Sequence, residues 1–511
     1  MIIGKVLAQR ALITPDREAL IFKESVFTYR RLNERANRLA NALLELGVKP
    51  GHRVGLLLFN SNQFLETYFA AAKIGGVLVP LNWRLVPSEL DFILKDCGVS
   101  EFIFGEAFED KAMEMDYLRH VRHRISTGPS SLPETLDYEN LLSDGNDREP
   151  LIPIDEGDLH VIMYTSGTTG YPKGAMLSHA GMHAGALNLL IGLQYQYPDR
   201  CLLLAPFFHS GAITPFLGHV IRGICTVLME SFDAAGALML IQEKKIKHLL
   251  GVTAIMQMLL HVPDLEAYDL RSWKYAMLPG SPLPYTLIRE AHDRIGVLCQ
   301  NLWGLTEMSG PGSLMNEEDI LRKPECAGKP FFSVDIRIVG PDDRDLPPEE
   351  KGEIIVRGPN MMLGYWNRPE ATKETIKEGW LYTGDMGKLD QEGYLYVIDR
   401  IKDMILSGGE NVYPAEIEVV IREIPWVQDV SVIGIPDEKW GEVPKAFVET
   451  VEGQRPDPDE IINFCRSKLA GYKVPKKIEF ISRLPRNPSG KVLKKELRAL
   501  SEKQVVTNKT D

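Results

Sequence analysis

The chain has 511 residues, of which 44% are hydrophobic, 25% are charged and 8% are aromatic. This composition is typical of a folded globular protein and excludes a collagen-like, disordered or membrane-embedded chain. Since 70 acidic residues oppose 58 basic ones, the formal net charge is -12, which argues against unspecific binding to nucleic acid or anionic lipid. A polyanionic ligand therefore needs a local basic site.

The six cysteines, at positions 97, 201, 225, 299, 326 and 465, lie far apart and form no C-x-x-C pair. This spacing argues against a zinc site or a disulfide framework. No stretch approaches the ~20 apolar residues that span a bilayer, and the first residues lack the pattern of a signal peptide. We therefore expect a reduced, cytoplasmic protein with no integral membrane segment and no nucleic-acid partner.

Over roughly the first 310 residues, short apolar runs alternate with longer patterns of helical spacing. The run at 54–59 predicts a buried strand, and residues 62–76 predict a helix that stops at Gly75 and Gly76 before a strand at 77–81. The same alternation predicts strands at 159–164, 249–252, 275–278 and 297–301, with helices at 178–193 and 254–260. Such alternation is typical of parallel sheets layered with helices.

The pattern changes near Val334. Residues 334–340 and 353–358 predict an antiparallel strand pair joined by a polar loop, and 393–399 predict another strand. Further on, we expect helices at 414–424 and 457–469 and strands at 427–435, 446–451 and 477–481. The predicted fold class is α/β: a large N-terminal domain, 1–400, of layered sheets and helices with a β-rich portion, and a small α+β C-terminal domain, 401–511.

A glycine-rich loop, YTSGTTGYPKGAML at 164–177, follows one of the predicted strands. Its glycines let backbone N–H groups converge, its hydroxyls add donors and Lys173 adds a positive charge, so the loop suits phosphate oxygens. It is not a Walker A loop, because Pro172 precedes the lysine and Gly174 replaces the hydroxyl residue that should follow.

The full string resembles the phosphate-binding signature of the adenylate-forming superfamily, which includes acyl-CoA synthetases, aryl-CoA ligases, amino-acid adenylation domains and luciferases. The resemblance covers essentially the whole chain, with the segments in the expected order. It implies a large adenylation domain, a small mobile C-terminal domain and ATP as substrate. In the loop it assigns ATP binding to Thr165, Ser166, Gly167, Thr168, Thr169, Gly170 and Lys173.

Further segments extend the resemblance. In NLWGLTEMSG, 301–310, Thr306 is implied to contact phosphate and Glu307 to hold Mg2+, a hard cation that prefers oxygen ligands. Asp385 in YTGDMG is implied to accept hydrogen bonds from the ribose hydroxyls, with Arg400 near the ribose and phosphate. The implied adenine-side and neighbouring positions are Gly280, Ser281, Pro282, Trp303 and Gly304, where Trp303 replaces the tyrosine more often found.

The C-terminal part carries the implied moving elements. Lys402 occupies the position of the pivot between the domains, and Ser407, Gly408 and Gly409 lie where the pantetheine arm of CoA approaches. Lys491, in PRNPSGK, matches the catalytic lysine. Lys491 must lie near the phosphate in the first step and leave room for the thiol in the second, which a pivoting domain allows.

The implied reaction couples a carboxylate to ATP, giving acyl-AMP and pyrophosphate, and then passes the acyl group to CoA. Lys491, Mg2+ on Glu307 and the loop donors act by electrostatic stabilisation and positioning, so no protein nucleophile is needed. No carboxylate is present in FFHS, 207–210, to pair an amino-acid ammonium group. The acyl-pocket positions offer no evident cation for a second carboxylate, so we expect a monocarboxylic fatty, alicyclic or aryl acid. These positions are His209, Gly251, Val252, Trp303, Gly304, Met308 and Gly310.

Three alternatives stay open at this point. The first alternative is an enzyme that passes the acyl group to a carrier-protein thiol instead of CoA. The second is a noncatalytic nucleotide or acyl sensor, and the third is a luciferase-type oxygenase. The combined presence of Thr306, Glu307, Asp385, Arg400 and Lys491 argues against the sensor. A homodimer is the assembly considered.

Overall fold

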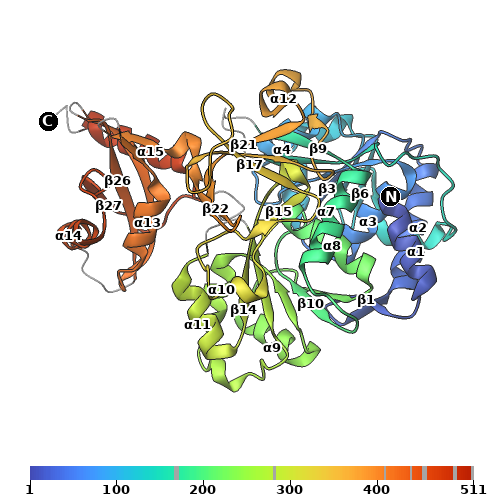
Figure 1. The fold of residues 1–511 in the computed structure, drawn as a ribbon. Coiled ribbons are helices and arrows are strands. Elements are labelled where there is room, and N and C mark those ends of the chain that lie inside the picture. The colour runs from blue at the N-terminus through green and yellow to red at the C-terminus, as the bar shows by residue number, and fades with distance from the viewer. Residues whose placement is uncertain are drawn as a thin grey trace. The chain divides into compact units, whose positions relative to one another are not determined.

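The computed structural model describes residues 1–165, 172–279, 283–407, 410–437, 440–451, 457–486 and 492–507. Contacts divide the chain into two units, Met1–Ile336 with Val356–Tyr382, and Arg337–Ile355 with Thr383–Asp511. Figure 1 shows the N-terminal part of the chain in blue to yellow and the C-terminal part in orange to red. The mixed α/β class is confirmed, with a large N-terminal and a smaller C-terminal part; the boundary at 400/401 stays a prediction.

A nine-stranded sheet in the first unit has the order β16-β15-β14-β13-β12-β10-β11-β1-β2. The pairs from β14 to β1 are parallel, whereas β2, β15 and β16 pair antiparallel at the two ends. Its strands are β1 (Glu18–Phe22), β2 (Ser25–Thr28), β10 (Arg200–Leu203), β11 (Cys225–Leu228), β12 (His248–Leu250), β13 (Tyr275–Pro279), β14 (Leu298–Leu305), β15 (Gly310–Leu314) and β16 (Lys329–Pro330).

An eight-stranded sheet in the same unit has the order β19-β9-β8-β4-β3-β5-β6-β7. The pairs from β8 to β7 are parallel, and β9 and β19 add an antiparallel end. The prediction of parallel sheets is therefore confirmed for the body of both sheets. The strands are β3 (Arg53–Leu57), β4 (Val77–Pro80), β5 (Glu101–Phe104), β6 (His123–Ser126), β7 (Thr135–Asp137), β8 (Leu159–Thr165), β9 (Lys173–Ser178) and β19 (Gly364–Tyr365).

Helices α1 (Ile3–Ile13), α3 (Asn62–Ile74), α7 (His179–Gly192) and α8 (Ser210–Arg222) pack on one another in the first unit. Because α3 contacts β4, α8 contacts β11 and α7 contacts β9 and β15, these helices join the two sheets. The other helices of this unit are α2 (Tyr29–Glu45), α4 (Pro87–Cys97), α5 (Glu109–Met113), α6 (Tyr138–Asp144), α9 (Ala234–Lys244), α10 (Thr253–Leu260), α11 (Tyr285–Ile295) and α12 (Pro369–Thr375).

Helix α3 shows how the sequence sets these elements. Ser61 accepts a hydrogen bond from the N–H of Phe64 and starts the helix, and Gly75 ends it in a left-handed conformation with φ 70°. Almost every side chain between them is buried, as expected for a helix enclosed on all sides. The predicted stop at Gly75 is confirmed.

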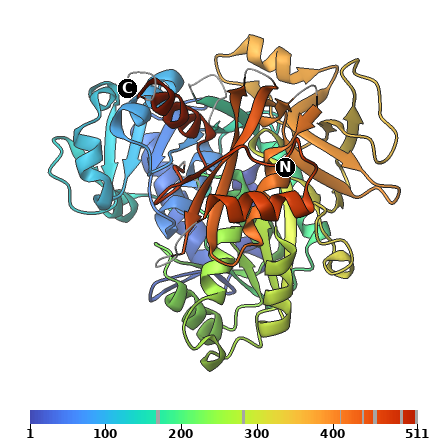
Figure 2. The same cartoon turned by 90° about the vertical axis from the view of Figure 1, so that its left-hand side faces the viewer.

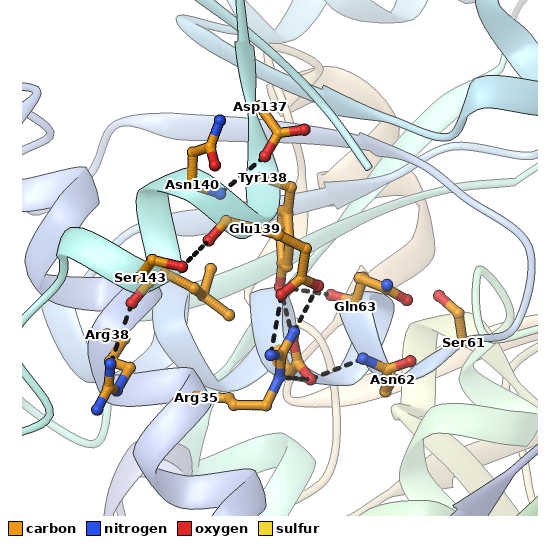
Figure 3. Close-up of polar contacts among 12 residues, drawn as sticks. Arg35, Arg38, Ser61, Asn62, Gln63, Asp137, Tyr138, Glu139, Asn140 and Ser143 are labelled. Carbon is orange, nitrogen blue, oxygen red and sulfur yellow. Dashed lines mark hydrogen bonds and ion pairs between the residues drawn. The ribbon is translucent and has the colours of Figure 1, made fainter. Parts of the chain in front are cut away.

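A buried ionic network ties α3 to α2 and α6, and Figure 3 shows Arg35 directed toward Glu139, Tyr138 and Asn62. Arg35 donates to both oxygens of the fully buried Glu66, at 2.6 and 3.1 Å, and to Glu139 at 2.7 and 3.0 Å. Tyr138 Oη and Asn62 Nδ2 each donate to Glu66 at 2.8 Å. The Glu66 carboxylate thus accepts hydrogen bonds from Arg35, Tyr138 and Asn62.

The second unit contains a five-stranded sheet of order β24-β23-β26-β25, with β27 paired to β26. Its strands, drawn in orange and red in Figure 2, separate two cores. Val430 and Val432 face the core beneath α13 and α14, and Ile433 and Ile435 the core that includes Leu497 of α15. The elements are β23 (Ile405–Ser407), β24 (Glu410–Val412), β25 (Val427–Asp437), β26 (Gly441–Thr450), β27 (Lys477–Phe480), α13 (Pro414–Arg422), α14 (Pro458–Lys468) and α15 (Lys494–Thr507).

The remaining sheet has five strands in the order β17-β18-β21-β20, with β22 pairing with β21. Its strands are β17 (Asp335–Val339), β18 (Gly352–Arg357), β20 (Ile376–Lys377), β21 (Trp380–Leu389) and β22 (Leu395–Arg400). Across the described ranges, no helix combines the length and the apolar character needed to cross a membrane.

Candidate active site

The glycine-rich loop joins β8 to β9, which pair antiparallel with Thr165 opposite Lys173. The two ends are also linked by a bond of 3.4 Å from the Thr165 hydroxyl to the carbonyl oxygen of Lys173. A Cβ atom on Gly174 would lie 2.6 Å from Ile162 and 3.1 Å from the Tyr164 ring, so the hairpin requires glycine there. The predicted residues Ser166, Gly167, Thr168, Thr169 and Gly170 lie outside the described residues.

The start of this loop is held from the side by Asp96 of α4. Tyr164 Oη donates to Asp96 Oδ2 at 2.6 Å, Arg368 Nη2 to Oδ1 at 3.0 Å and Trp366 Nε1 to the backbone carbonyl at 2.9 Å. Tyr164 directly precedes Thr165, so Asp96 fixes the end of β8 from which the loop departs. The local sequence pattern gave no signal for this contact.

Thr306 and Glu307 lie in a short 3-10 helix, Thr306–Met308, between β14 and β15. The backbone turns there through Ser309 at φ 52° and Gly310 at φ 112°. Tyr365 Oη donates to Glu307 Oε1 at 2.7 Å, and the N–H of Met362 donates to the Glu307 carbonyl at 2.7 Å. These bonds fix the side chain and the backbone of Glu307.

Tyr365 also links Glu307 to the hairpin. It lies opposite Ala175 in the pairing of β19 with β9, and the Lys173 ammonium lies 5.2 Å from the centre of the Tyr365 ring. The structure therefore brings Lys173 and Glu307 to opposite parts of one tyrosine. Sequence analysis missed Tyr365, because a two-residue strand carries no periodic pattern.

Asn360 supports the same turn from below. This fully buried side chain donates from Nδ2 to the carbonyls of Met308 at 2.8 Å and Pro311 at 2.9 Å. The segment 360–365 thus holds both ends of the turn that carries Thr306 and Glu307. A buried amide that satisfies two backbone carbonyls gives this turn a defined geometry.

The fit to Mg2+ rests on this donor set. Among the described residues there is no cluster of three or more His, Cys, Asp or Glu side chains that could hold a metal ion. Mg2+ is commonly held by one or two carboxylates together with substrate phosphates and water, rather than by a complete protein cage. A single fixed carboxylate such as Glu307 fits that mode.

Asp385 and Arg400, in the second unit, lie opposite each other on β21 and β22. Arg400 Nε pairs with Asp385 Oδ1 at 2.7 Å, and Arg400 Nη1 donates to the Thr383 carbonyl at 3.0 Å. The N–H of Asp385 donates to the Thr383 hydroxyl at 3.0 Å. The structure therefore brings these two predicted ribose residues together in an ion pair.

The predicted acyl-pocket residues follow neighbouring strands of the nine-stranded sheet. His209 precedes α8, Gly251 and Val252 follow β12, and Trp303 and Gly304 lie in β14. Because β10, β12, β13 and β14 are adjacent and parallel, the segments after them lie at one edge of the sheet, where open α/β sheets bind ligands. The predicted adenine-side residues Gly280, Ser281 and Pro282 follow β13 and lie outside the described residues.

Two glycines allow the close packing at this edge. A Cβ on Gly304 would lie 1.7 Å from the carbonyl oxygen of Gly310, and one on Gly312 would lie 2.7 Å from the Trp303 ring. Trp303 and Met308 are both buried. The indole at 303 therefore depends on the absence of a side chain at 312.

His209 is partly buried and precedes α8 at this edge. Its Nε2 atom is buried and has no hydrogen-bond partner within the described ranges. Burial, with a smaller effect of the positive charge of Arg84, lowers the pKa of His209 to about 4. The ring is therefore neutral at pH 7, and the nearby charge of Arg84 is a feature that sequence analysis did not find.

The predicted CoA and lid residues lie in the second unit. Ser407 ends β23 and is buried, and Gly408 and Gly409 lie outside the described residues. Lys402 lies in a 3-10 helix, Ile401–Asp403, where burial lowers its pKa. Lys491 also lies outside the described residues, between Arg486 and Val492, which pair as an isolated antiparallel bridge.

Comparisons with known proteins identify the family of the chain. Residues 7–366 match the model of the AMP-binding enzyme family, and residues 416–491 match the AMP-binding enzyme C-terminal domain. The chain belongs to the AMP-binding enzyme family. The prediction of an adenylate-forming enzyme is thereby confirmed at the level of the family.

Curated relatives match over nearly the whole chain. The chain is 39% identical over 498 residues to a feruloyl-CoA synthase of Amycolatopsis sp and to a long-chain-fatty-acid–CoA ligase of Mycobacterium tuberculosis. Each match covers 97% of this chain and 98% of the relative. Both relatives are named as enzymes that join an acid to CoA.

Solved structures of o-succinylbenzoate CoA synthetase from Bacillus subtilis are also similar. The complex with the acyl-adenylate intermediate OSB-AMP has a TM-score of 0.86 at 32% identity and covers 96% of this chain and 97% of that chain. The complex with ATP and magnesium ion has a TM-score of 0.86 at 33% identity and covers 96% and 98%.

Proposed function

We propose that this enzyme is an AMP-forming acid:CoA ligase for a monocarboxylic acid. The observation that carries the proposal is the placement of Lys173 and Glu307 on one tyrosine, Tyr365, at the base of the glycine-rich loop. A cation and a carboxylate fixed beside a phosphate-binding loop suit a nucleoside triphosphate with its metal. The names of the relatives support CoA as the acceptor.

In the first step, a carboxylate oxygen of the acid attacks the α-phosphorus of ATP, the bond to the β-phosphate breaks, and pyrophosphate leaves. Lys173 and the donors of the loop bind the phosphates, and Lys491 stabilises the charge that builds up at the α-phosphate. When bound on Glu307, Mg2+ neutralises phosphate charge. Asp385 accepts from the ribose hydroxyls and thereby orients the nucleotide.

In the second step, the sulfur of CoA attacks the carbonyl carbon of the acyl-AMP, and AMP leaves. We infer that the C-terminal domain pivots at Lys402 between the steps, which withdraws Lys491 and admits the pantetheine arm past Ser407. The boundary near residue 400 is part of this proposal. We also propose a reducing, cytoplasmic location, which is supported by the six cysteines, since all of them are free.

The acid is proposed to be fatty, alicyclic or aryl, because Val252, Trp303 and Met308 are apolar and the neutral His209 carries no charge for an anion.

A pyrophosphate-release assay over fatty, alicyclic, aromatic and dicarboxylic acids tests the proposal, with CoA or a holo carrier protein as acceptor. We expect release that depends on one monocarboxylic acid and yields its CoA thioester. Acid-independent release, or no release with any acid from folded protein, would contradict the ligase activity. If the thioester forms only on the carrier protein, the carrier protein and not CoA is the acceptor.

A further inference from the structure

The two ends of the segment that carries Lys491 are fixed in different ways. At its start, Arg486 bridges to Val492 and pairs with Asp429 of β25. At its end, the N–H of Leu493 donates to the Pro485 carbonyl at 2.7 Å, and α15 begins at Lys494. Lys491 itself lies outside the described residues, three positions before the first residue of α15.

Two cations of α15, one helical turn apart, hold its first part. Lys494 and Arg498 are four residues apart and therefore lie on the same face of the helix. Lys494 Nζ pairs with Glu418 Oε1 of α13 at 3.2 Å, and Arg498 Nη2 pairs with Asp403 Oδ1 at 3.0 Å. We call these two ion pairs the α15 latch.

In both ion pairs, the acidic side chain is largely shielded from water. The side chains of Glu418 and Asp403 are 13% and 11% exposed, and that of Lys494 is 17% exposed. Arg498 is the most accessible of the four side chains, at 39% exposed. Loss of one partner of such a pair leaves a partly buried charge uncompensated, which is destabilising. Glu418 is itself fixed, because it accepts from the N–H of Val432 at 2.8 Å.

The α15 latch is directed at the turn that contains the proposed pivot. Asp403 follows Lys402 directly, and Asp399 lies on the other side of Arg400. Asp399 accepts from the N–H groups of Arg400 at 2.7 Å and Ala415 at 2.9 Å, and Lys494 interacts electrostatically with both aspartates. Arg498 and Asp403, which are 95 positions apart in the sequence, thus join α15 to the turn at 399–403.

We propose that Lys494 and Arg498 are positioning residues that fasten the Lys491 segment to the pivot turn through the α15 latch. In the proposed pivoting at Lys402, α15 and the turn at 399–403 then move together, and the chain that carries Lys491 leads directly into α15. The proposal rests on the proposed function, in which Lys491 serves acyl-AMP formation but not the attack of the thiol.

The test uses the full-length enzyme with Lys494→Met and Arg498→Met combined, which keeps apolar stems and removes both cations. Acyl-AMP formation from acid and ATP, and thioester formation from supplied acyl-AMP, are measured separately. We expect acyl-AMP formation to fall at least about tenfold, since misplacement of a catalytic group is costly, while thioester formation stays within about twofold. Lys495→Met, which removes an exposed cation from the adjacent position, should leave both rates unchanged.

A cycle with Lys491→Ala separates positioning from general damage. If the α15 latch acts through Lys491, removing it in the Lys491→Ala enzyme causes no further loss of acyl-AMP formation, because the two changes are not additive. An independent loss in that background, or equal loss in both half-reactions, would overturn the proposal. The conservative pair Lys494→Arg and Arg498→Lys should retain most of the rate, and failure to do so with unaltered folding would also count against it.

Hydrogen exchange gives a readout that does not need catalysis. We expect faster exchange in peptides covering 485–499 and 399–404 when the α15 latch is removed, with peptides of the first unit unchanged. Unaltered exchange would show that the two ion pairs do not stabilise α15 or the turn at 399–403. If Lys491→Ala forms acyl-AMP at the normal rate, the proposed function itself is contradicted. If Lys491→Ala is impaired but the variant without the α15 latch has normal rates, only the proposal about the latch is contradicted.

Discussion

The hydroxyl group of Tyr365 determines how the Glu307 carboxylate is held. Its bond of 2.7 Å to Oε1 joins a phenol hydroxyl donor to a carboxylate oxygen acceptor. The ring, in contrast, faces Lys173. These two contacts can be separated by removing the hydroxyl alone.

We predict that Tyr365→Phe raises the Mg2+ concentration needed for half-maximal pyrophosphate release by about tenfold, which corresponds to the loss of about 1.4 kcal/mol. The reason is that the carboxylate at 307 loses its fixed orientation while the phenyl ring remains. A Mg2+ titration of the purified variant measures this change. Tyr285→Phe, at an exposed tyrosine of α11, is the control and should leave the titration unchanged; an identical curve for Tyr365→Phe would refute the role assigned to this hydroxyl.

Among the helices of the first unit, α2, α3 and α6 depend on one buried charge. Glu66 is fully buried, and Arg35, Asn62 and Tyr138 all donate to it. Glu139, which pairs with the same Arg35, is 51% exposed. The two carboxylates therefore offer a matched comparison of burial at constant chemistry.

We predict that Glu66→Gln lowers the free energy of unfolding by about 3 kcal/mol, because the new amide donor faces existing donors and Arg35 loses its buried partner. Glu139→Gln should cost about 1 kcal/mol or less, since its charge is screened by water. Urea unfolding of both variants, followed by circular dichroism, measures the difference. Equal effects would mean that the network in Figure 3 does not depend on burial.

Local periodicity predicted most of these elements. The apolar runs at 54–59 and 77–81 became β3 and β4, and the helical pattern between them became α3 with its end at Gly75. The pattern at 414–424 similarly became α13. In each case the signal lies within the element, as burial of one face or of the whole element imposes a repeat on its own residues.

Contacts between distant segments could not be predicted in this way. The Tyr365 bond to Glu307, the anchoring of Tyr164 by Asp96 and the α15 latch each join side chains that no local repeat relates. Pairing of Asp385 with Arg400 was anticipated only through resemblance to a family. Motifs in the sequence therefore led to hypotheses about the residues that serve the site, whereas the residues that hold them in place were found only in the structure.

The stability of the folded protein should depend on pH through histidines in its first unit. Burial lowers the pKa of His179 and His209 to about 4 and that of His219 to about 3. Below pH ~6.5 the unfolded chain binds protons at these rings while the folded protein does not. Stability is therefore present at neutral pH and is lost as the pH falls from about 6.5 toward 4.

We predict that each of these histidines lowers the free energy of unfolding by about 1.4 kcal/mol per pH unit within that window. Urea unfolding at pH 7, 6 and 5 measures the slope. His219→Asn should make the dependence of the free energy of unfolding on pH less steep, by the amount that one proton-binding group contributes. This holds whatever the effect of the substitution on stability at pH 7. A slope that His219→Asn leaves unchanged would contradict the neutral state of this ring.

The most direct measurement for the proposed reaction follows the oxygen atoms of the acid. A monocarboxylic acid that supports activity is labelled with ¹⁸O in both carboxylate oxygens and incubated with ATP, Mg2+, CoA and the enzyme. If a carboxylate oxygen attacks the α-phosphorus and the thiol later displaces AMP, mass spectrometry will find one ¹⁸O atom in AMP and none in pyrophosphate. Label in inorganic phosphate with formation of ADP, or unlabelled AMP beside labelled thioester, would contradict an acyl-AMP intermediate.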